Sequence, residues 1–91
     1  MAATNPKYLW WNGRQMPWEE ATVHVTDLAW STVGAVFEGI RGYWNDEQQE
    51  LHVFRLREHM ERLADSMRLV RLPLDYSVDE LIEVTLKLLR D

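Results

Sequence analysis

The 91-residue sequence contains no cysteine, and it has only four glycines and three prolines. Without cysteine, the chain has no disulfide framework, no thiolate metal site and no thiol nucleophile. The four glycines are scattered, so they form no glycine-rich phosphate-binding loop. No apolar run approaches the length of a signal sequence or of a membrane span. These absences lead us to expect a cytoplasmic protein.

Positive charge is also scarce, because 10 lysines and arginines stand against 15 aspartates and glutamates, for a net charge of −5. Proteins that bind nucleic acid usually carry a basic patch, so no partner of that kind is expected. Aromatic residues are abundant, with five tryptophans, three tyrosines and two phenylalanines. Such side chains fill a core or line an interface, and we favour a core with one adhesive apolar face.

The hydrophobic pattern predicts one α+β domain over residues 1–91. The Asn12-Gly13 pair is a strong hairpin signal, since both residues tolerate positive φ. A helix is predicted from Leu56 to before Pro73, and a second follows the capping box of Ser77 and Glu80. The whole reads as an antiparallel sheet of about four to five strands packed with two helices, the strands being expected at residues 8–11, 14–16, 22–26, 35–44 and 51–54.

The histidines offer no catalytic constellation. His24, His52 and His59 lack the spacing of a metal site, and for each we expect a packed or hydrogen-bonded structural role. Ser31 and Ser66 lack a nucleophile-elbow context. Neither a metal site nor a set of catalytic residues is therefore predicted within these 91 residues.

Arg55 lies where a predicted strand ends and the first helix begins. Free backbone N–H groups at a helix start, the helix dipole and a guanidinium together make a good anion site. The alternative is a surface ion pair between Arg55 and Glu58. Spacing leaves both readings open.

The stretch "VFEGIRGY" at residues 36–43 places charges and glycines within an apolar strand pattern. A glycine inside a strand weakens it and often marks the close approach of a ligand or another backbone. The pattern raises the question of what approaches this strand.

The motifs resemble the N-terminal part of fold-type IV, pyridoxal-phosphate-dependent aminotransferases, and among these the branched-chain amino acid aminotransferases most closely. The resemblance covers nearly the whole chain, and "FEGIR" and "FRLREHMERL" at this separation form a specific pair. It is carried by "WNG" (11–13), "PWEEATVHV" (17–25), "VFEGIRGYW" (36–44), "VFRLREHMERLADSMRL" (53–69) and "LPLDYSVDEL" (72–81).

The resemblance implies the small domain of the D-amino-acid aminotransferase-like fold, with pyridoxal 5'-phosphate as cofactor. It implies that Arg55 binds the cofactor phosphate. Phe37 would then supply an apolar wall of the substrate pocket, Gly39 room beside it, and Arg41 a polar group at its edge. Glu38, on the other face of the strand, is expected to form a structural pair. The implied reaction transfers an amino group from a branched-chain amino acid to 2-oxoglutarate.

Two departures from the family pattern stand out. Thr32 and Val33 replace an aromatic-glycine pair that helps to shape the substrate pocket, and Trp30 is a possible substitute for it. The family's Schiff-base lysine belongs to a second domain, and neither Lys7 nor Lys87 matches its motif. The second helix also runs to Asp91 without a turn signal. We therefore expect a chain cut before the catalytic-lysine domain and inactive alone.

Other functions remain open at this point. Within the family, the chain could derive from a D-amino-acid aminotransferase or a relative of aminodeoxychorismate lyase. Outside it, the chain could be a non-catalytic, stand-alone binding or interaction module. The small-molecule partners implied by the resemblance are amino acids and 2-oxo acids. Because family members are commonly dimers, we also expect a homodimer or self-association through exposed aromatic surface.

Overall fold

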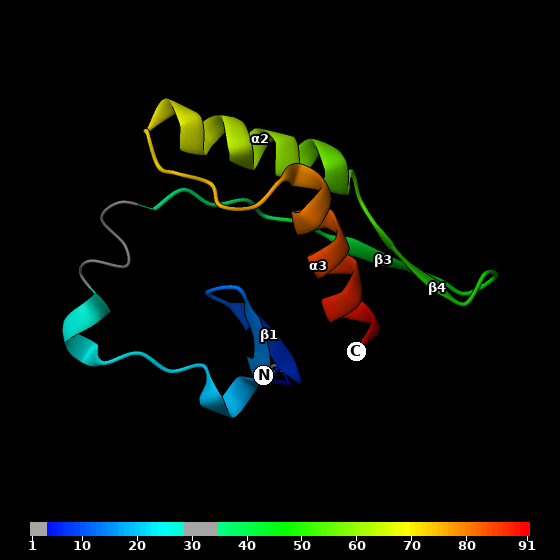
Figure 1. Ribbon diagram of the computed structural model, residues 1–91. Helices are drawn as coiled ribbons and strands as arrows, with labels where there is room; N and C mark the ends of the chain where they lie inside the picture. Colours follow the sequence, from blue (N-terminus) through cyan, green and yellow to red (C-terminus); the bar gives the residue numbers. More distant parts are fainter. Residues whose placement is uncertain (1–3, 29–34) are drawn as a thin grey trace. The chain divides into compact units, whose positions relative to one another are not determined.

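The computed structural model describes residues 4–28 and 35–91, which form two antiparallel hairpins and two α-helices (Figure 1). The predicted α+β class is confirmed. The four strands pair as two separate two-stranded sheets, β1 with β2 and β3 with β4. The elements are β1 (Tyr8–Trp11), β2 (Arg14–Pro17), the 3-10 helices η1 (Trp18–Glu20) and η2 (Val25–Asp27), β3 (Gly42–Asn45), β4 (Glu50–Val53), α2 (Leu56–Leu69) and α3 (Val78–Arg90).

The first hairpin forms where its turn residues favour it. Asn12 and Gly13 have φ angles of 49° and 82°, the left-handed conformation that this pair adopts readily between strands. The turn aligns Trp11 with Arg14 and Tyr8 with Pro17. In the second hairpin, Gly42 is aligned with Val53 and Asn45 with Glu50. The predicted Asn-Gly hairpin is therefore confirmed, with its return strand extending to Pro17.

The two helices begin and end close to the predicted positions. The backbone N–H of Glu80 donates to Ser77 Oγ at 3.0 Å, and the N–H of Ser77 donates to Glu80 Oε1 at 3.3 Å. This reciprocal pair is the predicted capping box, which satisfies two of the N–H groups that a helix start leaves free. In α2 the apolar stripe buries Leu56 and Met60, whereas Val70, just beyond the end of the helix, is exposed.

The strand predicted at residues 22–26 is not formed. His24 instead caps the 3-10 helix η2, and its Nδ1 accepts a hydrogen bond from the backbone N–H of Thr26 at 3.2 Å. Thr26 Oγ1 also lies 2.8 Å from this nitrogen. A local bond from side chain to backbone competes with a strand ladder. The alternating β-branched pattern of residues 22–26 therefore predicted a strand wrongly, because a strand also needs a neighbouring strand with which to pair.

The strand predicted at residues 35–44 is only partly formed. Strand β3 begins at Gly42, and one further backbone hydrogen bond joins Phe54 N to Arg41 O at 2.8 Å. The ladder stops there because Arg55, the next residue of the partner strand, turns into the left-handed conformation (φ 50°) to begin α2. Residues 36–40 consequently have no partner strand within the described chain.

The chain divides into two compact units, whose boundary falls within α3. One comprises Met1–Ala35 and Glu83–Asp91, the other Val36–Ile82. Among the described residues, Met16 is the buried apolar side chain of the first unit, and Leu56, Met60 and Leu81 are those of the second. Among the described residues, no helix is both long and apolar enough to span a bilayer. The features relevant to function lie in the second unit.

Candidate functional site

Arg55 occupies the residue that precedes α2, in a strained backbone conformation. Its φ and ψ are 50° and 45°, and a non-glycine residue in this region costs about 1–2 kcal/mol. No side chain of the described residues caps this helix start. The first-turn N–H groups of α2 therefore remain available to a bound anion.

The Arg55 side chain lies over an aromatic ring and not against a carboxylate. Its guanidinium carbon is 5.5 Å from the centre of the Phe54 ring, within the range of a cation–π contact. Within the described part of the chain, Arg55 forms no salt bridge, so the alternative ion pair with Glu58 is not formed. The N–H donors of the guanidinium can therefore bind an anionic ligand.

A pocket of about 390 Å³ opens beside Arg55 at the beginning of α2. Its described lining residues are Phe54, Arg55, Glu58, His59 and Arg62. They combine an aromatic wall with cationic and polar groups. Glu58 is the acidic member, and its position in the first turn complements the helix dipole.

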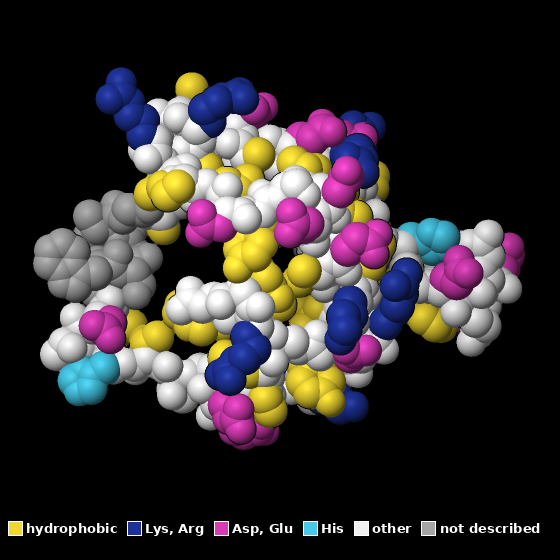
Figure 2. Space-filling model, in the orientation of Figure 1, with side chains coloured by type: hydrophobic (Ala, Val, Ile, Leu, Met, Phe, Trp, Pro, Cys, Tyr) yellow, Lys and Arg dark blue, Asp and Glu magenta, His cyan; other side chains and the backbone are white. Residues whose placement is uncertain are grey.

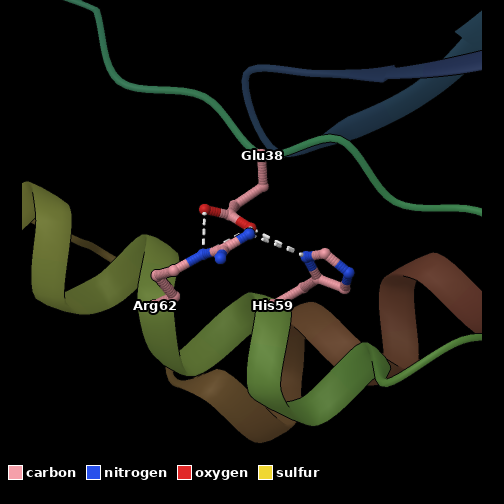
Figure 3. Close-up of polar contacts among 3 residues, drawn as sticks. All are labelled: Glu38, His59 and Arg62. Carbon is pink, nitrogen blue, oxygen red and sulfur yellow. Dashed lines mark hydrogen bonds and ion pairs between the residues drawn. The ribbon is translucent and has the colours of Figure 1, made fainter.

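Next to this pocket, Glu38 accepts hydrogen bonds from two residues of α2 (Figure 3). Arg62 grips both carboxylate oxygens, with Nε 2.9 Å from Oε2 and Nη2 2.6 Å from Oε1. His59 Nδ1 lies 2.8 Å from Oε1. The side chain of Glu38 is 8% exposed and that of His59 17%, whereas that of Arg62 is 66% exposed. The structural pair expected for Glu38 is confirmed.

Hydrogen bonding from Arg62, followed by that from His59, lowers the pKa of Glu38 from 4.5 to about 2. At neutral pH the carboxylate is therefore ionised and can only accept hydrogen bonds. It follows that His59 Nδ1 carries the proton in its bond to Oε1. Arg62 Nη2 lies 3.4 Å from the same nitrogen. Because both atoms are donors, this contact is not a hydrogen bond, and the two atoms are close because both donate to Glu38 Oε1.

This depressed pKa gives a testable dependence on pH. In the unfolded chain Glu38 takes up a proton near its ordinary pKa of 4.5, whereas in the folded chain it resists protonation until about pH 2. Its contribution to stability is complete above pH 4.5 and is lost as pH falls toward 2. Carbon-13 NMR of the Glu38 carboxyl should report a midpoint near 2 in the folded state. A midpoint near 4.5 would show that the cluster does not form in solution.

The residues predicted to face a substrate share the outer side of the segment 36–41. Burial alternates along it, with Val36, Glu38 and Ile40 turned inward. The outward, exposed set is Phe37, Gly39 and Arg41. None of these three lines the pocket beside Arg55, although the backbone of Arg41 bonds to that of Phe54. The structure thus gives Arg55 and the outward set two distinct surroundings.

The remaining polar predictions can also be located. His24 and His52 are hydrogen-bonded to Thr26 and Gln48 respectively, so all three histidines have the structural partners expected of them. Within the described residues, no group of three or more potential ligand side chains could hold a metal ion. Trp30, Thr32 and Val33 lie outside the described residues.

Both lysines interact with neighbouring side chains. Lys87 Nζ is 2.6 Å from Asp91 Oδ2, and Lys7 Nζ lies 5.2 Å from the centre of the Tyr8 ring.

Sequence reasoning did not find that His59 and Arg62 together bind the carboxylate of Glu38. Their spacing of three residues, which places both on one side of a helix, was the available signal.

Comparison with known proteins identifies the relationship. No family model matches the sequence. The branched-chain-amino-acid aminotransferase of Salmonella typhimurium is 43% identical over 90 residues, which are 99% of this chain and 28% of that protein. The branched-chain amino acid aminotransferase of Thermobaculum terrenum, solved in its PLP form, superimposes with a TM-score of 0.89 at 58% identity, covering 94% of this chain and 28% of that one. This chain is a homologue of branched-chain amino acid aminotransferases.

The resemblance that the sequence motifs indicated is therefore confirmed. The Escherichia coli branched-chain amino acid aminotransferase also superimposes on the present chain, with a TM-score of 0.73 and 44% identity. The match covers 88% of this chain and 26% of the Escherichia coli chain. The present chain spans about 28% of the length of the curated aminotransferases that it matches. The pocket beside Arg55 and the cluster around Glu38 therefore lie in a chain that corresponds to little more than a quarter of the length of these relatives.

Proposed function

We propose that residues 1–91 form the N-terminal small domain of a pyridoxal-phosphate-dependent branched-chain amino acid aminotransferase. The full-length protein moves the amino group of leucine, isoleucine or valine to 2-oxoglutarate, giving the branched 2-oxo acid and glutamate. The observation that carries this proposal is the similarity to such enzymes over 99% of the chain. Because neither lysine matches the family's catalytic motif, these 91 residues by themselves are expected to be inactive.

In this proposal Arg55 binds the phosphate group of the cofactor. Three features support the assignment: the guanidinium has no salt bridge within the described chain, the start of α2 has no side-chain cap, and a pocket opens beside both. A phosphate dianion complements these donors, because a guanidinium fork and free helix N–H groups bind its oxygens in concert. The cofactor, when bound, supplies the electron sink of amino transfer, while this chain holds and orients its phosphate.

We assign the substrate side of the domain to Phe37, Gly39 and Arg41. Their shared outward face supports this assignment, and Phe37 is 88% exposed, which is unusual for so large an apolar side chain. A branched aliphatic side chain fits against such a ring. Gly39 leaves space beside the ring, because a Cβ added there meets nothing within 4 Å. Arg41 supplies a polar group at the edge of the pocket.

The full-length protein is also proposed to be a cytoplasmic homodimer. Exposed apolar side chains, visible in yellow in Figure 2, support association of this domain with other protein surface. Sedimentation of the isolated chain at micromolar concentration tests the idea, and a monomer without any tendency to associate would count against it. Within the described part of the chain, the exposed aromatic residues are Trp11, Trp18, Phe37, Tyr43, Trp44 and Phe54.

The function itself is tested with the full-length protein that contains this chain. Purified with pyridoxal 5'-phosphate, it should form glutamate from 2-oxoglutarate with leucine, isoleucine or valine as amino donor. D-alanine and aminodeoxychorismate serve as comparison substrates for the two related chemistries. Activity confined to either of these would overturn the branched-chain assignment, and failure to bind the cofactor would overturn the enzyme assignment altogether.

A further inference from the structure

Glu38 faces away from the residues on either side of it. Phe37 and Gly39 lie on the outward side of segment 36–41, whereas the side chain of Glu38 is 8% exposed and its carboxylate is turned toward α2 (Figure 3). Whatever fixes this carboxylate therefore also fixes the backbone that presents the two outward residues.

Among the described residues, few other polar interactions hold this segment in place. The backbone hydrogen bond that these residues show to the neighbouring strand, from Phe54 N to Arg41 O, is at the end of the segment. Among the described residues, Glu38 makes the only ion pairs between the segment and α2. The grip is directional, because Arg62 approaches both carboxylate oxygens and His59 approaches one of them from a second side.

The other end of this connection is Arg55. The backbone N–H of His59 donates to Arg55 O at 3.0 Å, so His59 lies one helical turn beyond Arg55. His59 and Arg62 also line the pocket that contains Arg55. The carboxylate of Glu38 is thus bound to the turn of α2 that follows the proposed phosphate-binding residue.

We propose that Glu38 is a positioning residue, which sets the spacing between the substrate-facing residues Phe37 and Gly39 and the phosphate-binding Arg55. This inference rests on the proposed function. It adds a half-buried carboxylate that touches neither substrate nor cofactor but determines how the two binding surfaces are arranged. Errors of about 1 Å in such an arrangement cost roughly 100-fold in rate.

The test compares Glu38→Gln, Arg62→Lys and Asp65→Asn in the full-length protein. Glutamine keeps the size of Glu38 but loses its charge, and lysine keeps the charge of Arg62 but loses the two-pronged grip. Asp65 is the matched control, because it pairs with Arg68 on the same helix at 2.6 Å and is exposed. The readouts are KM and kcat for leucine, and Kd for pyridoxamine 5'-phosphate, which has no aldehyde with which to bond to lysine.

Glu38→Gln is expected to raise both KM and Kd roughly tenfold with a smaller change in kcat. Arg62→Lys is expected to raise KM and Kd by a smaller factor. Asp65→Asn should match the wild-type protein. A purely structural role would reduce the fraction of folded enzyme, which lowers the apparent kcat but leaves KM and Kd unchanged.

Unchanged KM and Kd in Glu38→Gln would overturn the inference. If that variant does not fold, Arg62→Lys decides, because Arg62 is 66% exposed and its replacement is tolerated more readily. Failure of the wild-type protein to bind pyridoxamine 5'-phosphate would instead overturn the proposed function and the inference with it. The two failures are therefore distinguishable.

Discussion

Replacing Arg55 with alanine is expected to weaken the binding of pyridoxamine 5'-phosphate to the full-length protein by roughly 10- to 150-fold. The reason is the loss of charge-assisted hydrogen bonds to the phosphate, each worth about 1.5–3 kcal/mol. Arg55 has no carboxylate partner among the described residues, so its removal leaves no buried acid unpaired. The measurement is an equilibrium titration of the apoprotein followed by absorbance.

Arg57→Ala provides the matched control for this prediction. Arg57 lies two residues further along the chain and pairs with Asp79 at 2.8 Å, where both side chains are exposed. Exposed pairs of this kind contribute little, so Kd should remain within about twofold of the wild-type value. Arg55→Lys should fall between alanine and wild type, because lysine restores the charge without the fork. Equal Kd values for Arg55→Ala and wild type would remove Arg55 from the cofactor site.

Replacing Gly39 with valine is expected to lower kcat/KM for leucine by roughly 10- to 200-fold, because the added methyl groups occupy space assigned to the substrate side chain. Stability should change by no more than about 0.5 kcal/mol. A Cβ at Gly39 meets nothing within 4 Å, and the φ of this residue is not positive, so the backbone accepts a side chain. Steady-state kinetics with leucine and valine, together with thermal unfolding, measure both effects.

Gly42 is the natural comparison, because a Cβ there would lie 3.2 Å from Leu51 Cδ1. Gly42→Val should therefore alter the stability of the β3–β4 hairpin while leaving the preference between leucine and valine unchanged. In Gly39→Val that preference should shift toward the smaller substrate. Identical behaviour of the two variants would mean that Gly39 has a structural role and does not face a substrate.

The locally encoded parts of this protein could be predicted from the sequence alone. Asn12 and Gly13 specify their turn because both residues tolerate positive φ. Ser77 and Glu80 specify the start of α3 because each bonds to the other's backbone. These interactions join residues no more than three positions apart, so the local amino-acid sequence is enough to predict them. The family motifs were likewise readable, and with them the relationship to branched-chain amino acid aminotransferases.

Interactions between distant residues were decided only by the tertiary structure. The sequence indicated that Glu38 forms a pair, but its partners, His59 and Arg62, lie 21 and 24 residues away. The strands predicted at 22–26 and 35–44 fail or shorten because a strand requires a partner, and alternation alone does not reveal whether one exists. The left-handed backbone of Arg55, which ends the ladder and begins α2, is likewise imposed by chain geometry that the preferences of a single residue do not specify.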